Sequence, residues 1–519
     1  MKFTIIITGD TTMDSEFIQD KEIIVASNRG PVVFKRNATG EIELIRGAGG
    51  IVGSMIPFLK KTHGTWVSSA IGECDHYMNN KYNGKVPISS DNPEYYVQFV
   101  KTEEDVYNRF NGKFANPLLW FIHHSMWNPP YSPCADDELH QAWDSYQHVN
   151  SMFAETIGGD IYKSEKTPIV MLQDYHIYLA PKMIRKAHPD VLMTQFVHIP
   201  FPAPEIFQQL PNHMQTEILE SVLTNNVLGF HIKRYMKNFL RTVEQILPTA
   251  SVDELSGDIL YEGHICHVRT YPISIDIETL QKQGQAPNVA SKEAEIDEIV
   301  GDCKLIYRTD RADLSKNIIR GFQAYDMFLE RYPEWKEKVK FVATLMPSRQ
   351  DIKIYREYTD NIRDIVKNIN EKHATLDWEP IKYICKGDFD LVVALLKRYD
   401  VLMVNPILDG MNIVAKEGSV LNENNGVLIL STGAGCYEEL NDGAICINPY
   451  DLRQTAESIE MALLMDDKSK SHLLAEARAA IMGNDLNKWV SDQLGDIERI
   501  MYEKQQLKLK DREEAVRMN

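Results

Sequence analysis

Short runs of apolar and β-branched residues recur along the chain, with longer amphipathic stretches between them. Several runs are apolar throughout, which is typical of strands covered on both faces. Alternation of such strands with helices favours doubly wound parallel sheets, so the sequence predicts an α/β protein. The predicted strands are Ile23–Ala26, Ile169–Leu172, Leu192–Val197, Leu305–Arg308, Lys340–Leu345, Val401–Val404, Val427–Leu430 and Ala444–Ile447.

The stretches between the strands carry one apolar face, as helices that cover a sheet should. One stripe consists of Ile318, Phe322, Tyr325 and Leu329, at steps of four, three and four residues. Asp451 precedes another stripe and is predicted to cap that helix with its side chain.

The chain of 519 residues exceeds what one compact core holds, at roughly 150 residues per domain. Residues 276–300 carry Gln-Lys-Gln-Gly-Gln-Ala-Pro-Asn and few large apolar side chains, so we expect a linker there. The predicted parts are an N-terminal extension (1–21), a first domain (22–275), a second domain (276–485) and a C-terminal helix (486–519).

The charge balance limits the partners. The 56 Lys and Arg residues stand against 74 Asp and Glu, a net charge of −18. This argues against binding to nucleic acid or anionic membranes, and an anionic substrate would need a local group of cations. Seven cysteines without a CxxC pair indicate a reducing, cytoplasmic protein. The Phe3–Thr8 run is too short for a signal or a membrane anchor.

A glycine-rich segment, Arg46–Gly53, follows a strand-like run at Ile42–Ile45. Glycines let backbone N–H groups approach a phosphate at a helix N-terminus. The spacing is not the GxGxxG of dinucleotide-binding proteins. A tight turn therefore explains the segment as well as a phosphate loop does.

Two cations follow the predicted strand at Leu305–Arg308. Arg311 and Lys316 stand before a helix, at the carboxyl edge where open α/β sheets bind ligands. Together they would suit a diphosphate, Arg as a planar fork and Lys as a point charge. A surface salt-bridge network with Asp310 and Asp313 accounts for the same spacing.

The segment Asn405–Glu417 also follows an apolar strand. Gly410 permits an unusual turn, and the helix start beyond it offers free N–H groups. Asp409 would suit sugar hydroxyls and Glu417 ribose hydroxyls. Alternatively, Asp409 is a turn residue and Glu417 faces solvent.

Asp174 and His198 each stand at the end of a predicted strand, and the two strands are neighbours. This placement suits acceptor orientation or proton handling. A lone histidine, however, is more often structural.

Metal binding is not favoured. The pair His123-His124 and the group at His264–His267 lack a matching second cluster. Asp388 begins an Asp-x-Asp pattern that metal-dependent sugar transferases use, but it precedes a helical run and is better explained as a cap. We therefore expect no metal and no cofactor.

Together these segments resemble the trehalose-6-phosphate synthase family, retaining glycosyltransferases with two facing Rossmann-like domains (the GT-B architecture). The similarity extends from Val25–Arg29 to Asp485. The resemblance implies that fold, with a C-terminal helix that crosses back to the first domain. Its most specific parts are Asp174–His176, His198–Pro202, Arg311 with Lys316, and Asp409–Glu417.

The resemblance also implies site residues. Arg311 and Lys316 would bind the diphosphate, Glu417 the ribose, and Asp174 the acceptor. Catalytic roles are implied for Arg311, Lys316, His198 and Asp174. The donor side comprises Gly50, His198, Arg311, Lys316, Asp409, Gly410, Met411, Asn412, Ile413, Val414 and Glu417. The acceptor side comprises Arg29, Trp120, Asp174 and Arg349.

The implied reaction is a metal-independent transfer of glucose from UDP- or GDP-glucose to a phosphorylated acceptor, first of all glucose 6-phosphate. The sequence leaves the nucleotide and a homo-oligomeric state open. The chain departs from the family pattern at Ser69, Asn111 and Leu408, where the family has Trp, Tyr and Arg, and at Asn317, where it has Gly. Two alternatives therefore stay open. One is another acceptor, as in glucosylglycerol-phosphate or validoxylamine-phosphate synthases, and the other is a silent regulatory homologue that binds sugar phosphates.

Overall fold

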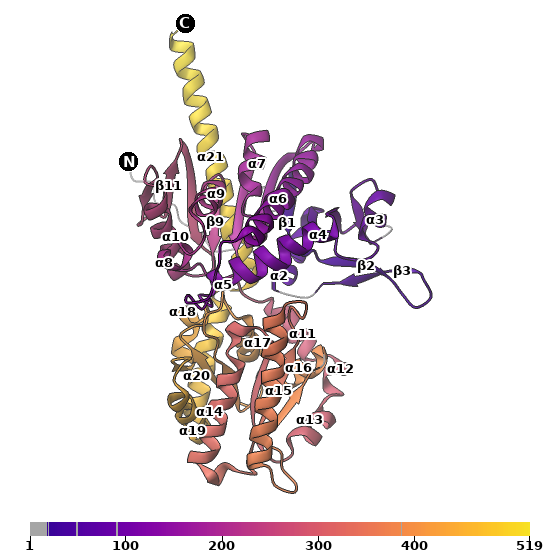
Figure 1. Ribbon diagram of the computed structural model, residues 1–519, viewed down its shortest axis with the longest axis vertical. Helices are drawn as coiled ribbons and strands as arrows, with labels where there is room; N and C mark the ends of the chain where they lie inside the picture. Colours follow the sequence, from indigo (N-terminus) through magenta and orange to yellow (C-terminus); the bar gives the residue numbers. More distant parts are fainter. Residues whose placement is uncertain (1–17, 19, 48–49, 90–91, 386, 519) are drawn as a thin grey trace.

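The computed structural model describes residues 18, 20–47, 50–89, 92–385 and 387–518, with side chains as far as residue 506, and forms two lobes (Figure 1). Most of the predicted N-terminal extension lies outside the described residues. The first strand begins at Lys21, the last residue of that predicted extension. Ile18 is buried in the core of the upper lobe.

A ten-stranded sheet forms the upper lobe, in the order β10-β11-β12-β9-β8-β7-β1-β4-β6-β5. Its inner strands are parallel, as predicted, whereas β5, β10 and β11 are antiparallel at the edges, where hairpins add short strands. A two-stranded hairpin, β2 and β3, lies beside it. The strands are β1 Lys21–Ser27, β2 Val32–Arg36, β3 Ile42–Arg46, β4 Thr65–Ser69, β5 Val86–Ile88, β6 Tyr95–Val100, β7 Thr167–Gln173, β8 Leu192–Val197, β9 Val227–Phe230, β10 Ser251–Asp253, β11 Asp258–Tyr261 and β12 His264–Thr270.

A six-stranded sheet forms the lower lobe, in the order β15-β14-β13-β16-β17-β18, and all its pairings are parallel. All eight predicted strands are present in the two sheets, which confirms the α/β fold class. The lower strands are β13 Lys304–Arg311, β14 Val339–Met346, β15 Ile381–Ile384, β16 Val401–Val404, β17 Val427–Ser431 and β18 Ile445–Ile447.

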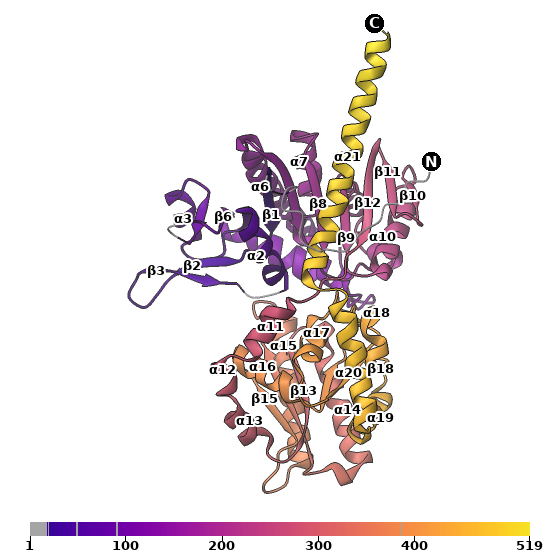
Figure 2. The ribbon, with the colours of Figure 1, turned by 180° about the vertical axis from the view of Figure 1, so that it is seen from behind.

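Helices cover both sheets (Figures 1 and 2). The predicted stripe of α14 is buried, and Asp451 accepts a hydrogen bond from Gln454 N at 2.9 Å, as expected of a cap. Among the described helices, none combines the length and apolar character that a membrane crossing requires. The upper helices are α2 Gly50–Thr62, α3 Asp75–Lys81, α4 Glu104–Arg109, α5 Trp120–His123, α6 Asp137–Lys163, α7 Ala180–Ala187, α8 Pro204–Phe207, α9 Asn212–Val222 and α10 Lys233–Ile246. The lower helices are α11 Ile277–Gly284, α12 Pro287–Ala290, α13 Glu293–Val300, α14 Ile318–Arg331, α15 Lys353–His373, α16 Phe389–Arg398, α17 Ile413–Leu421, α18 Tyr437–Leu440, α19 Leu452–Leu464 and α20 Asp467–Met482.

The predicted linker at residues 276–300 is not extended. It forms α11, α12 and α13, which pack against α16 and α17 of the lower lobe. The prediction is wrong because a few apolar side chains, Leu280, Val289, Ile296 and Val300, suffice to bury one face of these short helices. We propose that the second domain begins near residue 276, because these helices belong to the lower lobe.

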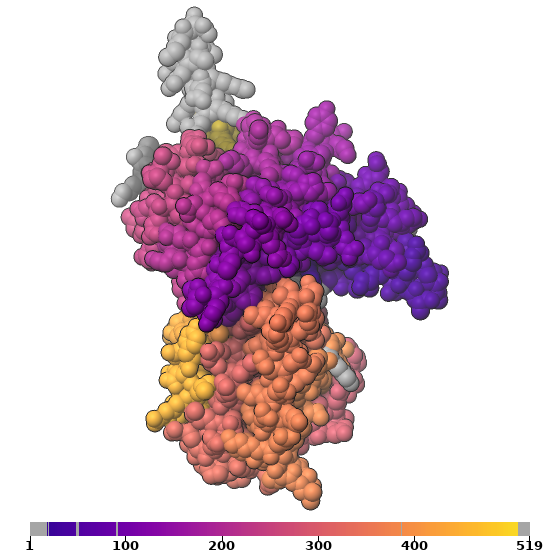
Figure 3. Space-filling view, in the orientation of Figure 1, coloured from indigo at the N-terminus to yellow at the C-terminus, as the bar shows by residue number. Residues whose placement is uncertain are grey.

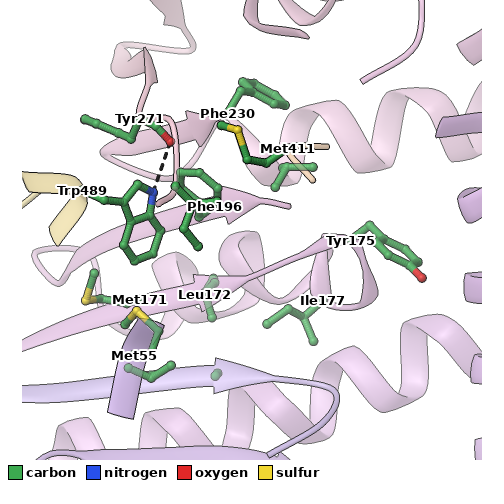
Figure 4. Packing of buried hydrophobic residues seen from close by; sticks show 14 of the residues in the cluster. Met55, Met171, Leu172, Tyr175, Ile177, Phe196, Phe230, Tyr271, Met411 and Trp489 are labelled. Atoms are coloured by element: carbon green, nitrogen blue, oxygen red, sulfur yellow. Dashed lines mark hydrogen bonds between the residues drawn. The ribbon is translucent and has the colours of Figure 1, made fainter. Parts of the chain in front are cut away.

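The chain passes between the lobes twice, at Tyr271–Asp276 and at Gly483–Leu486, and these two crossings touch through Leu486 N and Ile275 O (3.3 Å). After the second crossing, α21 (Leu486–Met518) runs along the upper lobe (Figure 2). Trp489 is buried there, with its ring 5.2 Å from that of Phe196, and its Nε1 donates to Tyr271 O at 3.1 Å (Figure 4).

The strand order of each sheet reverses direction at one strand. β1 lies between β7 and β4, and β13 lies between β14 and β16. Ligands of open α/β sheets bind beyond the carboxyl ends of the strands at such positions. Gly410, after β16, lies against His198, after β8, and Arg349, after β14, donates to Asn116 of the upper lobe, so these segments meet where the two lobes touch, at the waist of the molecule (Figure 3). This position is therefore the candidate site.

Candidate active site

Lys316 ends the 3₁₀ turn Leu314–Lys316 that follows β13. Its Nζ donates to Asp409 Oδ2 at 2.5 Å and lies 3.7 Å from Asp310 Oδ1. Burial alone would lower the pKa of Lys316, but Asp409 and Asp310 outweigh it and raise the pKa, so the ammonium stays charged. The site thus contains a fixed positive charge at the carboxyl edge of the lower sheet.

Arg311 ends β13, and its Nη2 lies 2.8 Å from Asp313 Oδ2. The salt-bridge alternative is therefore realised in part, because Asp310 and Asp313 do pair with the two cations. It is not a surface network, since the side chains of these acids are only 7% and 2% exposed. The side chain of Arg311 itself is 62% exposed, and its positive charge lowers the pKa of the Asp174 carboxyl in the upper lobe.

Asn317, where the family has glycine, adopts a left-handed backbone with φ of 58°. Asparagine tolerates this conformation better than most side chains. Its Nδ2 donates to Asn405 O (3.0 Å) and Pro449 O (2.7 Å), which fixes the turn between β13 and α14. The departure therefore preserves the geometry that a glycine would allow.

The segment after β16 approaches the upper lobe closely. A Cβ on Gly410 would lie 2.0 Å from His198 O, so only glycine fits there. Asn412 has φ of 73° and begins α17, and its Nδ2 donates to Asp409 Oδ2 at 3.0 Å. Its Oδ1 is buried and has no hydrogen-bond partner among the residues described.

The remaining donor-side positions lie on or beside α17. Ile413 and Val414 form its first turn and are half-buried, whereas Met411 is buried in the core (Figure 4). Burial raises the pKa of Glu417 to about 7, so its carboxyl is removed from water and is not the solvent-facing group of the alternative interpretation. Leu408, which replaces a family arginine, is half-buried at the start of the segment.

Asp174 follows β7 with φ of 72° and ψ of 179°, a conformation that costs energy for any residue other than glycine. Its Oδ1 accepts from His198 N at 3.3 Å. Burial raises the pKa of this carboxyl to about 7, and Arg349 and Arg311 lower it only in part. Strain and a pKa near neutrality together make Asp174 a candidate functional position.

His198 follows β8, and its imidazole is enclosed by aromatic side chains. The ring packs between Phe196, His231 and Trp489. Its Nε2 is hydrogen bonded to Gln173 Oε1 at 2.8 Å, and burial places its pKa well below 6.5. A neutral buried ring does not favour proton handling, so the carbonyl beside Gly410 is the group of His198 that reaches the donor side.

Arg349 connects the lobes on the acceptor side. It has φ of 44°, and its Nη1 donates to Asp313 Oδ1 (2.9 Å) and to the Tyr355 hydroxyl (3.1 Å). Its Nε donates to Asn116 Oδ1 in the upper lobe at 3.1 Å, and its guanidinium lies 5.0 Å from the centre of the Trp120 ring. Arg349 and Trp120 are thus brought together, as the resemblance implies.

Arg29 and Gly50 lie at the edge of the upper lobe. Arg29 is exposed just after β1. Burial lowers the pKa of His176 to about 3, with smaller effects from Arg349 and Arg29, so both arginines face the same ring. Gly50 is the first residue of α2, and residues 48–49 of its loop lie outside the described residues.

Four residues of the site were missed by the sequence analysis. Tyr235 donates from its hydroxyl to Asp409 O across the lobes at 2.6 Å, and Asn116 and Tyr355 contact Arg349. Asp313 was considered only in the alternative of a surface salt-bridge network. Only its spacing in Arg311-x-Asp313 was visible in the sequence, because the other contacts join residues far apart along the chain.

The described residues contain no group of three or more His, Cys, Asp and Glu side chains placed to hold a metal ion. His123 Nδ1 is hydrogen bonded to Pro200 O and His124 Nδ1 to Trp120 O. Asp388 accepts from Leu391 N at 3.0 Å, which confirms that it caps α16.

The sequence model of glycosyltransferase family 20 matches residues 21–499. The UDP-forming alpha,alpha-trehalose-phosphate synthase of Schizosaccharomyces pombe is 30% identical over 96% of this chain and 93% of its own length. The 56 kDa subunit of the same enzyme from Kluyveromyces lactis is 32% identical over 86% of this chain and 90% of its own.

Solved structures of the same family share the fold. The trehalose-6-phosphate structure from E. coli with bound UDP-2-fluoro glucose superposes with a TM-score of 0.79 at 26% identity, covering 92% of this chain and 98% of that one. The UDP-forming enzyme of Burkholderia xenovorans, in complex with glucose-6-phosphate, superposes with a TM-score of 0.79 at 25% identity, covering 92% and 100%. Both structures have the GT-B fold, and the two-sheet arrangement of this chain matches it. The chain therefore belongs to glycosyltransferase family 20.

Proposed function

We propose that this chain transfers glucose from UDP-glucose to glucose 6-phosphate, forming trehalose 6-phosphate and UDP. The observation that carries the proposal is the grouping of Arg311, Lys316 and Arg349 with Asp174 and Asp409 between the two lobes. Cations suit the diphosphate and the acceptor phosphate, and the acids suit sugar hydroxyls. The names of the relatives, which are UDP-forming, support UDP as the nucleotide.

The leaving diphosphate is the group that the site stabilises. Negative charge develops on its oxygens as the bond to the sugar breaks, and Lys316 and Arg311 supply fixed positive charge. The first N–H groups of α17 are free of intrahelical partners and add to this field. Glu417, one turn farther along α17, would bind the ribose hydroxyls.

We further propose retention of configuration. The acceptor hydroxyl attacks the anomeric carbon from the face that UDP leaves, the bond from carbon to the diphosphate oxygen breaks, and the proton passes to the departing phosphate. Asp409 is committed to an ion pair, because Lys316 outweighs burial and lowers its pKa. Asp174, with a pKa near neutrality, is suited to orient the acceptor hydroxyls.

A different acceptor is the second candidate, and a specific network favours it. Asn28 Oδ1 accepts from Ser69 Oγ (2.9 Å), and Asn28 Nδ2 donates to Asn111 Oδ1 (3.1 Å). Asn111 Oδ1 also accepts from Asn116 Nδ2 at 2.8 Å. Small polar groups therefore fill positions where the family has Trp and Tyr, beside Arg349. An acceptor of another shape would suit this surface.

The test measures nucleotide release from UDP-glucose and GDP-glucose with a panel of phosphorylated acceptors. The proposal expects release of UDP with glucose 6-phosphate and only background release without an acceptor. Release with glycerol 3-phosphate or an aminocyclitol phosphate, but not with glucose 6-phosphate, would replace the acceptor and keep the reaction class. Binding of both substrates without any release would identify the silent homologue instead.

Metal independence and a cytoplasmic location are also proposals. The first is supported by the ion pairs and helix N–H groups that already face the diphosphate position. We expect activity to be unchanged by EDTA, and a loss that Mg²⁺ restores would contradict this. The second is supported by the seven cysteines, all of which are free thiols.

A further inference from the structure

Asp313 lies between β13 and the 3₁₀ turn, and its side chain is 2% exposed. Its two carboxylate oxygens contact two different arginines. Oδ2 lies 2.8 Å from Arg311 Nη2, and Oδ1 accepts a hydrogen bond of 2.9 Å from Arg349 Nη1. One buried carboxylate therefore joins the proposed donor-side and acceptor-side arginines.

Helix capping does not account for this position. Other aspartates at helix starts, such as Asp388 and Asp451, accept a hydrogen bond from the backbone N–H three residues on. Asp313 stands in the same place before its turn, but its side chain caps nothing. Burial would raise its pKa, but Arg311 and Arg349 outweigh burial and lower the pKa to about 2, so the carboxylate is charged at neutral pH.

Asp313 contacts both arginines, and Arg349 also donates to the Tyr355 hydroxyl. Within the described part of the chain, Asp313 is the one acid at ion-pair distance from the largely exposed Arg311. Arg349 has a left-handed backbone, and its Nε donates to Asn116 Oδ1 in the other lobe. A guanidinium held at one edge by a carboxylate presents its remaining N–H groups in a defined plane, which suits phosphate oxygens.

We propose that Asp313 is a positioning residue that orients Arg311 toward the donor diphosphate and Arg349 toward the acceptor phosphate. The inference rests on the proposed function, because it takes these arginines as the two anion ligands. It predicts that one substitution weakens both ligand sites, each through its own arginine.

The test is a pair of double-mutant cycles with Asp313→Asn, which keeps the shape and removes the charge. Calorimetry measures the affinities of UDP and of glucose 6-phosphate. We expect Asp313→Asn to weaken each at least about fivefold. In an Arg311→Ala background it should change UDP affinity less than about twofold, and in an Arg349→Ala background it should change glucose 6-phosphate affinity equally little. Fully additive losses would overturn the proposal, because a merely structural aspartate acts whichever arginine is present.

Asp451→Ala, at the capped start of α19, is the control: it removes the capping acceptor, so it should lower the melting temperature and leave both affinities unchanged. If circular dichroism shows that Asp313→Asn does not fold, Asp313→Glu carries the same cycles, since it keeps the charge and displaces the carboxylate by one methylene. Wild-type protein that binds neither ligand would refute the proposed function. Wild-type protein that binds both, with Asp313 variants that bind equally well, would refute only the inference.

Discussion

Single residues carry the charge of the site, and the cations after β13 give the most direct prediction. Arg311→Ala and Lys316→Ala should each lower turnover at least about tenfold, equivalent to about 1.4 kcal/mol of barrier. The reason is that each removes positive charge from the proposed diphosphate position. Nucleotide release measures the effect, and Arg453→Ala, on the exposed face of α19, should keep wild-type turnover. Wild-type rates in both site variants would remove these residues from the mechanism.

Asp174 gives a prediction about pH. Its pKa is raised from 3.8 to about 7, so between these values the folded protein holds a proton that the unfolded chain has lost. The free energy of unfolding therefore falls as pH rises through this window, by about 1 to 3 kcal/mol after allowance for screening by solvent. Asp174→Asn does not titrate, so it should lose less stability than wild type between pH 5 and pH 8.

Melting temperatures at the two pH values test this prediction. Glu417→Gln should change the pH dependence in the same direction, because the pKa of Glu417 is also raised to about 7. Equal slopes for wild type and Asp174→Asn would show that the carboxyl of Asp174 is ionised throughout.

The sequence predicted the positions of the site residues better than their partners. Arg311, Lys316 and Asp409 were found because motifs at strand ends are local in the chain. Their contacts were not, since Lys316 and Asp409 are 93 residues apart and Arg349 reaches Asn116 across 233 residues. The sequence left open whether Asp313 lies in a surface network, because sequence does not reveal burial.

At the scale of elements, the close approach of the Gly410 segment to the end of β8 gives a third prediction. Gly410→Ala would place a methyl group 2.0 Å from His198 O, so backbone must move. We expect a loss of about 1 to 3 kcal/mol in the free energy of unfolding and at least about a tenfold loss of turnover.

Chemical denaturation and nucleotide release measure these two effects. Gly159→Ala is the control, because a Cβ at that position of α6 meets no atom within 4 Å. Alanine in a helix interior should there raise stability by up to about 1 kcal/mol. Equal behaviour of the two variants would show that the contact with His198 is unimportant.

Elements covered on both faces were predictable, and polar ones were not. β16 and the Ile169–Leu172 part of β7 are continuous apolar runs. β4 (Thr-Trp-Val-Ser-Ser) was not among the predicted strands although all five residues are buried, because three of them are polar. The helices at residues 276–300 were taken for a linker because most of their side chains are polar and exposed.

At the scale of the molecule, a few polar contacts hold the lobes in the arrangement of Figure 1. They include Tyr235 Oη to Asp409 O (2.6 Å), Arg349 Nε to Asn116 Oδ1 (3.1 Å) and Lys416 Nζ to Ile273 O (2.9 Å). Domain interfaces of this polar kind permit relative motion. The combined variant Tyr235→Phe/Asn116→Ala should therefore be more open in solution than wild type.

Small-angle X-ray scattering of the ligand-free protein measures the change as a larger radius of gyration. Tyr358→Phe is the control, because its hydroxyl accepts from Ile318 N within the lower lobe. Scattering curves that coincide for all three proteins would show that the two contacts do not set the distance between the lobes.

The paired crossings at Tyr271–Asp276 and Gly483–Leu486 have a mechanical consequence. The two crossings lie side by side, and α21 attaches the second one to the upper lobe. Together they form a hinge between the lobes. The lobes can rotate about this hinge, but they cannot slide or twist far without breaking both crossings. A small molecule must therefore enter and leave on the side of the interface opposite the hinge. Cutting one of the two crossings alone would not separate the lobes.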